Sequence, residues 1–255
     1  METIGIIAAM SLERDALLHL IKGWERCAPG PFHSQRFRRL ERDCFLVTSG
    51  MGLKRAAEAA RALIGAIDPQ LLVSVGVAGA VHDNLEIGDV VACRNTCRLD
   101  QGLAGPFQPL ALLSEAARRA AAQALLPRRA SLVDGSAVTT RGSQYVLHQP
   151  EEMTNPILEM ETAGIARVAA EQGIPLLCLR AISDGPRALI PFNLETVMDA
   201  EYNLRIGELI KSVLRHPKAI LQLGRMGRNT RKAAGNAAIA LIAALSQPSP
   251  LILQR

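Results

Sequence analysis

Short apolar runs alternate with segments of helical periodicity along most of the chain, and this alternation constrains the fold more than any other feature. The runs predict buried strands, because they are apolar on both faces of the strand, and the longer segments predict helices. We expect strands at 3–9, 44–48, 71–77, 88–93, 130–138 and 175–183, and helices at 12–21, 53–67, 110–125, 162–172 and 194–214. Strands that alternate with helices predict an α/β domain whose sheet is covered on both faces.

Composition narrows the functional class. Of 255 residues, 49% are hydrophobic and 21% charged, which excludes global disorder, and aromatic residues are only 3%, which disfavours base-stacking nucleic-acid platforms. Five scattered cysteines do not form a disulfide framework; the pair Cys93 and Cys97 is either a metal site or, as we favour, two reduced thiols. The N-terminus lacks the features of a signal peptide, and the apolar run 237–245 is too short to span a bilayer. We therefore expect a cytoplasmic protein.

Charge is distributed unevenly. Residues 205–255 contain nine Lys or Arg and a single acid, Glu208, so this tail carries +8 while the rest of the chain carries −3. We divide the chain into an α/β domain at 1–214 and a basic helical extension at 215–255. On this division, a chain cut after Leu214 should keep its activity.

Three expected strands end in glycine-rich turns, at 49–52 (SGMG), 76–79 (GVAG) and 183–185 (SDG). Glycine allows the backbone to approach a ligand closely, and ligands of such sheets bind beyond the carboxyl ends of the strands. Each turn alone could be an ordinary strand-to-helix connection. Three at one predicted edge indicate a binding site.

Carboxylates cluster near these strand ends. Glu13 follows the first strand, Asp184 ends the last, and Glu159 and Glu161 precede the helix expected from residue 162. Carboxyls at such positions suit general acid–base chemistry if burial raises a pKa toward neutrality. The alternative is structural: Glu159 or Glu161 could stabilise a helix N-terminus, and Asp184 could be a simple N-cap.

Five ordered motifs resemble the methylthioadenosine/adenosylhomocysteine nucleosidases of the nucleoside phosphorylase superfamily. The resemblance covers about residues 3–190. The motifs are 4–10 (IGIIAAM) followed by Glu13, 49–52 (SGMG) with Ala56 and Ala57, 75–81 (VGVAGAV) with 87–91 (IGDVV), 159–163 (EMETA) and 180–184 (RAISD). The resemblance implies one three-layer α/β/α domain around a mixed, twisted sheet, and cleavage of a purine nucleoside N-glycosidic bond without a metal or organic cofactor.

The resemblance also implies a role for each matching residue. Asp184 would be the general acid that protonates the purine N7, and Glu13 would orient the attacking water. Glu161 would hold the ribose hydroxyls, with Met160 packed against the sugar. The remaining substrate contacts would come from Val138, Ala78 and Gly79, and the nucleophile pocket from Arg180, Ala9 and Val77.

One departure bears on the nucleophile. The superfamily's phosphorylases hold phosphate with an Arg and a Ser or Thr around the central-strand turn, whereas this chain has Ser74 and Val77 at the matching positions. Val77 also replaces a small polar residue common in the nucleosidases. The sequence therefore favours water over phosphate.

The tail beyond residue 198 resembles the C-terminal extension of hopanoid-associated phosphorylases, which implies a lipid-linked adenosine such as adenosylhopane as substrate. On this interpretation basic residues of 205–255 face an anionic membrane surface on the inner membrane face, and apolar residues dip into the acyl boundary. Those apolar residues are Ile220, Leu221, Leu223, Ile239, Leu241 and Ile242. The alternative is a solvated basic helix that covers the body or an oligomer neighbour.

Three functions thus remain. The first is cleavage of an adenine nucleoside that is lipid-linked. The second is a soluble methylthioadenosine/adenosylhomocysteine nucleosidase, and the third is a non-catalytic nucleic-acid-binding protein, which the acidic body and the few aromatic residues disfavour. The resemblance further suggests a homodimer or larger assembly.

Overall fold

In the computed structural model, one sheet forms the centre of the protein. The structure describes residues 1–28, 31–100, 103–140, 153–186 and 218–253, and all structural statements refer to these. The strands are β1 (Glu2–Ala8), β2 (Glu25–Cys27), β3 (His33–Arg39), β4 (Arg42–Thr48), β5 (Leu71–Ala80), β6 (Val90–Asp100), β7 (Leu103–Ala104), β8 (Gln108–Pro109), β9 (Leu132–Thr139), β10 (Pro156–Glu159) and β11 (Leu176–Asp184). Their main order is β10-β9-β6-β11-β5-β1-β4-β3-β2, and β10 also pairs with β5.

The sheet is mixed. Strands β4, β1, β5 and β11 are parallel neighbours, as are β6, β9 and β10, whereas β11 pairs antiparallel with β6 and β3 pairs antiparallel with both β2 and β4. The carboxyl ends of β1, β4, β5 and β11 therefore meet at one edge. This is the edge that the glycine-rich segments predicted.

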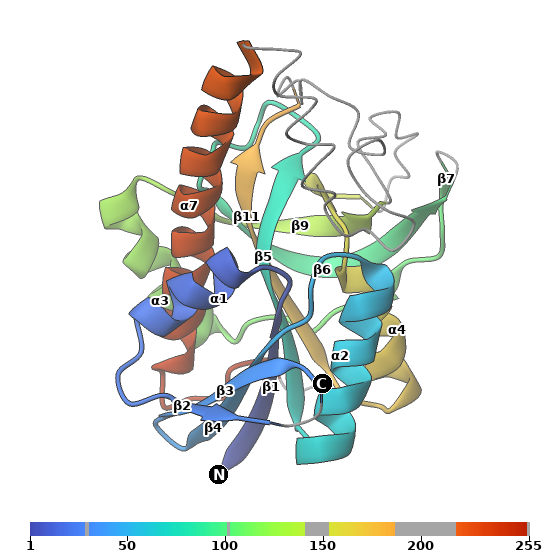
Figure 1. Cartoon of the computed structure of the whole chain (residues 1–255), viewed down its shortest axis with the longest axis vertical. Coiled ribbons are helices and arrows are strands. Elements are labelled where there is room, and N and C mark those ends of the chain that lie inside the picture. The colour runs from blue at the N-terminus through green and yellow to red at the C-terminus, as the bar shows by residue number, and fades with distance from the viewer. Residues whose placement is uncertain (29–30, 101–102, 141–152, 187–217, 254–255) are drawn as a thin grey trace.

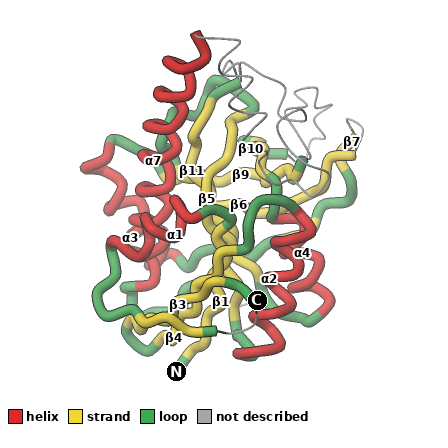
Figure 2. Tube along the Cα trace, viewed as in Figure 1, coloured by secondary structure: helices red, strands yellow, loops and turns green. Residues whose placement is uncertain are grey.

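Helices cover both faces of the sheet, so the predicted three-layer α/β fold is confirmed (Figure 1). The helices are α1 (Ser11–His19), α2 (Leu53–Ile67), α3 (Glu115–Leu125) with the 3-10 turn η1 (Leu126–Arg128), α4 (Thr162–Glu171) and α7 (Lys218–Leu245). Helices α1, α3 and α7 pack on one face and α2 and α4 on the other, and each layer encloses its own apolar cluster. Figure 2 shows the two helical layers on either side of the strands.

Helix α7 belongs to the core. Its C-terminal half, from Ala233 to Leu245, packs against β5, β11, α1 and α3, and Leu241 is fully buried. The expectation that Leu241, Ile242 and Ile239 enter a membrane is wrong, because the first two are buried in the protein core and the third packs against it. The alternative, a helix that covers the body, holds for this half. The side chains of 220–223 lie outside the described residues.

The described part of the chain contains no helix long and apolar enough to cross a bilayer. The N-terminal half of α7 instead extends past the body (Figure 1) and exposes Arg225, Arg228 and Arg231. The predicted division at residue 214 thus separates two segments that pack together through α7.

Arg42 joins the first strand to the end of α7. Its buried guanidinium donates to the carbonyl oxygens of Leu245, Gln247 and Ser249, at 2.6–2.8 Å, and its Nε pairs with Glu2 at 2.9 Å. Four acceptors compensate the desolvated cation, as burial of a charge requires. Arg42 therefore connects β1 to the segment at and after the end of α7.

Several element boundaries differ from the sequence expectations. Strand β5 continues through the glycine-rich stretch 76–79 to Ala80, because that stretch pairs with β11 and β10. Helix α3 begins only after its N-cap Ser114, since Leu110 and Ala111 bond to β6 and to the start of β11. Strands β2, β3 and β10 were not predicted, and the expected helix at 194–214 lies outside the described residues.

Candidate active site

Buried charged groups gather at the edge where β1, β5 and β11 end. Glu13, Glu159 and Glu161 are each at most 6% exposed, and Arg180 on β11 is 1% exposed. Charged side chains are almost never fully buried unless they are paired. We therefore describe the candidate site through the groups that pair with these four side chains.

Glu13, in the first turn of α1, accepts three backbone hydrogen bonds. Its Oε2 receives the N–H groups of Ala9 and Met10, and its Oε1 receives the N–H of Val77 on β5, each at 2.9 Å. Burial nevertheless raises the pKa of the Glu13 carboxyl, against the lowering effects of Arg180 and of these bonds. The site thus holds a carboxyl with enhanced affinity for a proton.

Arg180 crosses the sheet edge next to a glycine that leaves room for it. A Cβ added at Gly76 would overlap both Arg180 Nη1 and Glu13 Oε1, so no side chain fits there. Arg180 Nη2 donates to Ser74 Oγ at 2.9 Å and to Thr162 Oγ1 at 3.2 Å, while its Nε has no partner within the described part of the chain. Gly76 is therefore required by close packing.

Glu159, the last residue of β10, binds both Arg180 and the start of α4. Its Oε2 accepts from Arg180 Nη2 at 3.0 Å, from Thr162 Oγ1 at 2.7 Å, and from the backbone N–H groups of Glu161 and Thr162. The Thr139 hydroxyl donates to its Oε1. The structural alternative considered for Glu159 is correct, since its carboxylate caps α4.

Glu161 is held more loosely. Its Oε1 accepts the N–H of Gly52, at the turn after β4, at 2.9 Å, and its Oε2 lies 3.7 Å from Arg180 Nη2. Burial raises the pKa of the Glu161 carboxyl to about 7, and the negative charges of Glu159 and Glu13 contribute to the rise, against the lowering effect of Arg180. Near neutrality this carboxyl can be either protonated or ionised.

Asp184 ends β11 beside Gly79, where an added Cβ would come within 2.7 Å of Asp184 Oδ2. Ser183 Oγ donates to Asp184 Oδ1 at 2.5 Å and lies 3.3 Å from the carbonyl oxygen of Ala78. Burial raises the pKa of the Asp184 carboxyl, and the Ser183 bond opposes that effect. Gly79 and Val77 are two residues apart on β5, so Asp184 and Glu13 approach neighbouring positions of one strand.

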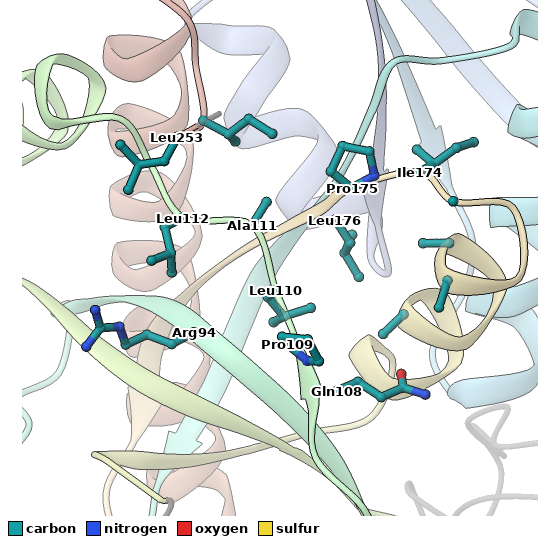
Figure 3. A pocket seen from close by; sticks show the side chains of 15 residues that line it. Arg94, Gln108, Pro109, Leu110, Ala111, Leu112, Ile174, Pro175, Leu176 and Leu253 are labelled. Carbon is teal, nitrogen blue, oxygen red and sulfur yellow. The ribbon is translucent and has the colours of Figure 1, made fainter. Parts of the chain in front are cut away.

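Two cavities differ in their relation to this cluster. A cavity of about 100 Å³ adjoins it, lined by Met160, Gly52, Leu53 and Thr139 among others. An apolar groove of about 940 Å³ lies between the end of α4, the start of β11 and residues 108–112 (Figure 3), with only Arg94 and Gln108 as polar side chains. The described lining of the larger groove contains no carboxyl, imidazole or thiol group, so the acid cluster is the better candidate for the site. The described residues contain no group of three His, Cys, Asp or Glu side chains arranged to bind a metal ion.

Comparison with known proteins agrees with this geometry. The family model described as "Phosphorylase superfamily" matches residues 3–215. The chain belongs to the phosphorylase superfamily. A curated relative, the 5'-methylthioadenosine/S-adenosylhomocysteine nucleosidase of Haemophilus influenzae (strain PittEE), is 27% identical over 201 residues, which cover 71% of this chain and 86% of that protein.

Solved structures share the fold of this chain. The nucleosidase of the same name from Colwellia psychrerythraea, in complex with adenine, has a TM-score of 0.70 at 19% identity, covering 98% of this chain and 96% of that one. Futalosine hydrolase of Helicobacter pylori has a TM-score of 0.67 at 19% identity, covering 95% and 96%. The family and the curated relative agree with the predicted class of enzyme, a nucleosidase or nucleoside phosphorylase.

The structure brings most of the predicted site residues of this superfamily member together. Glu13, Glu161 and Arg180 form one cluster, with Ala9 and Val77 contributing backbone N–H groups. The others lie around it: Asp184, Ala78 and Gly79 at the adjoining strand ends, and Met160 in the small cavity. The side chain of Val138 is fully buried with Cys97 and Leu99.

Thr139 and Thr162 were not predicted as site residues, and Glu159 was given no role by the resemblance, although all three complete the cluster. Thr139 ends β9, and its hydroxyl both donates to Glu159 and accepts the N–H of Ala163. Its position at a strand end was the available sequence signal. Thr162 carried a second signal, since Thr is common at helix N-termini and α4 begins at this residue.

Proposed function

We propose that the protein hydrolyses the N-glycosidic bond of adenine nucleosides, with 5'-methylthioadenosine and S-adenosylhomocysteine as the first candidate substrates. The similarity to the Haemophilus influenzae nucleosidase supports this substrate class. The burial and partners of Glu13, Glu161, Arg180 and Asp184 support the chemistry. The alternative stated from the sequence thus becomes the main proposal.

The observation that carries hydrolysis is the position of the Glu13 carboxylate. It accepts the N–H groups of Ala9, Met10 and Val77, a set of converging donors of the kind that binds anions. With a carboxylate already on these three N–H groups, a phosphate would meet like charge and would find none of the three free. Water is the nucleophile compatible with this arrangement.

The proposed reaction uses two carboxyls on opposite sides of the bond. Asp184, whose pKa burial raises, gives its proton to N7 of the purine as the bond between C1' and N9 breaks. Glu13, whose pKa is also raised, takes a proton from the water whose oxygen bonds to C1'. The products are adenine and the free sugar, whose C1' carries the hydroxyl group derived from water.

Glu161 and Arg180 have supporting roles in this proposal. An ionised Glu161 can accept hydrogen bonds from both ribose hydroxyls, and Met160 in the adjoining cavity would pack against the sugar. The negative charge of the buried carboxylates stabilises the cationic sugar of the transition state. Arg180 limits the mutual repulsion of those carboxylates.

The decisive experiment compares adenine release with and without phosphate. We expect equal rates in phosphate-free buffer and in phosphate, and a reducing sugar as the second product. A strict requirement for phosphate, with a ribose 1-phosphate product, would overturn the proposed hydrolysis. The Glu13→Gln variant should lose turnover in both buffers, whereas a phosphorolytic enzyme would gain anion affinity from this change.

The other sequence predictions have less support. For the lipid-linked adenosine, the apolar residues assigned to the acyl boundary in the second half of α7 are inside the protein. Among the described side chains, the exposed Arg225, Arg228 and Arg231 are compatible with a peripheral contact with an anionic membrane, and this contact remains a prediction, as does the homodimer. Sedimentation of the full chain with anionic and with neutral vesicles tests the first, and mass measurement in solution tests the second.

A further inference from the structure

Glu13, Glu159 and Glu161 surround one guanidinium. Arg180 influences the pKa of Glu13 and of Glu161, and it bonds directly to Glu159. All four groups are removed from water, where each charge costs free energy unless it is compensated. Which carboxyl receives the positive charge therefore decides which carboxyls keep a proton.

The distances assign the guanidinium to Glu159. Arg180 Nη2 lies 3.0 Å from Glu159 Oε2 but 3.7 Å from Glu161 Oε2, which is beyond a hydrogen bond. Ser74 and Thr162 accept from the same Nη2 and hold it on the Glu159 side. Glu159 itself cannot move toward another partner, because four further donors fix its carboxylate.

Glu161 is left with weak compensation. The groups that face it are Arg180 from β11, Glu159 from the end of β10, Glu13 from α1 and the Gly52 N–H from the turn before α2. Two of the three charged groups are negative, and the one cation hydrogen-bonds to Glu159 at 3.0 Å while it stays 3.7 Å from the Glu161 carboxylate. The high proton affinity of Glu161, with its pKa of about 7, is the expected result of this arrangement.

We propose that Glu159 is a positioning residue that draws Arg180 away from Glu161 and thereby sets the pH range in which Glu161 can accept hydrogen bonds from a ribose. A protonated carboxyl has only one strong acceptor oxygen and a donor, so it binds two hydroxyls less well than a carboxylate. The part of this statement that concerns ribose rests on the proposed function. The part that concerns protonation of Glu161 does not.

The first test measures protonation directly. Protein labelled with ¹³C at the glutamate carboxyl carbon is titrated by NMR, and the Glu161 signal is assigned by its loss in Glu161→Gln. Replacing the Glu159 carboxylate in Glu159→Gln should lower the Glu161 midpoint by about one pH unit or more, a tenfold change in proton affinity. An unchanged midpoint in the folded variant overturns the proposal.

Ser74→Ala is the matched control. It removes a neutral partner of the same Arg180 nitrogen and leaves every carboxylate in place, so the Glu161 midpoint should remain near that of the wild type. An equal shift in this control and in Glu159→Gln would mean that the charge of Glu159 is not the cause. If Glu159→Gln does not fold, Glu159→Asp serves, because it withdraws the carboxylate from Nη2 by one methylene; here an unchanged midpoint also overturns the proposal.

The second test uses turnover. In the wild type, KM for an adenine nucleoside should fall as pH rises through about 7, because Glu161 ionises in that range. In Glu159→Gln the same limb should move to lower pH, whereas a purely structural defect would change kcat or stability without moving it. A limb that stays in place overturns the ribose part of the proposal. If the wild type cleaves no adenine nucleoside, the proposed function fails while the NMR titration still decides the role of Glu159.

Discussion

At the scale of single residues, Asp184 offers the sharpest test of the chemistry. Asparagine at this position can still accept the Ser183 hydrogen bond, but it has no proton to give to a leaving base. We expect Asp184→Asn to lower kcat for adenine release by roughly 10²–10⁴-fold, the usual contribution of general acid–base catalysis. Steady-state kinetics measure this effect, and calorimetric binding of adenine should be nearly unchanged. A variant with wild-type kcat would exclude Asp184 as the acid.

For Glu161 we expect ionisation to favour substrate binding and to lower the stability of the folded state. Because its pKa is raised from 4.5 to about 7, the folded state binds the proton more tightly than the unfolded state. The stability that this provides is present below pH 4.5 and is lost as pH rises through about 7. Glu161→Gln cannot ionise, so it should be more stable than the wild type at pH 8, by up to roughly 3 kcal/mol.

Urea denaturation at pH 8 and pH 5 measures this difference, which should shrink at the lower pH. The same variant should bind ribonucleosides less well. Equal stability of variant and wild type at pH 8 would contradict the assigned proton affinity.

The sequence motifs grouped several residues into one predicted site, and the roles of these residues in the reaction stay predictions. Glu13, Arg180 and Glu161 were placed in the site by their motifs and strand-end positions, and the structure brings them together. The role of Glu159 remained ambiguous, because a carboxyl just before a helix can stabilise the helix N-terminus whether or not it also takes part in acid–base chemistry. Only its distance to Arg180 on another strand shows that it also carries an ion pair.

At the scale of elements, the glycines of β5 allow charged side chains to pack directly against the strand. Gly76→Ala would place a methyl group against both Arg180 and Glu13, so we expect a loss of activity of roughly 10²-fold or more, the cost of a displacement of about 1 Å in a catalytic site. Overpacking should also lower the free energy of unfolding by about 1–3 kcal/mol. Activity assays and denaturation curves measure the two effects.

Gly65→Ala in α2 is the matched control. A methyl group added there would meet no atom within 4 Å, and alanine in a helix is favoured over glycine by about 0.5–1 kcal/mol. Activity should be unchanged and stability slightly higher. A similar loss of activity in both variants would show that the effect is not local to the site.

Element boundaries followed the sequence where local signals agreed with tertiary contacts. The predicted helix at 53–67 is α2, whose amphipathic pattern and turn residues were both visible. The helix expected from residue 110 was too long, because Leu110 and Ala111 bond to distant strands, which no local pattern reveals. Strand β3 was missed because its Arg-rich sequence at the side of the sheet lacks a continuous apolar run.

At the scale of the whole molecule, α7 completes the apolar core on one face of the sheet. The expectation that a chain cut after Leu214 keeps its activity is replaced, because that cut removes the apolar face covering β5 and β11. We expect the shortened chain to show no cooperative unfolding transition in circular dichroism. A folded, active shortened chain would contradict the assignment of α7 to the core.

A point substitution tests the same helix within the full chain. Leu241 is fully buried, so Leu241→Ala should cost about 2–5 kcal/mol of unfolding free energy. Leu253 is 47% exposed, and Leu253→Ala should stay within about 0.5 kcal/mol of the wild type. Chemical denaturation distinguishes the two.

The hydrogen bonds from Arg42 to the carbonyl oxygens at and after the end of α7 have a consequence for biosynthesis. A ribosome that adds roughly 5–20 residues per second needs on the order of 10–40 s to pass from β1 to α7. Throughout that interval one face of the growing sheet lacks α7, and Arg42 lacks the carbonyl oxygens that compensate its charge. The nascent chain therefore presents apolar surface until α7 has been synthesised, and we expect it to bind chaperones that act during synthesis.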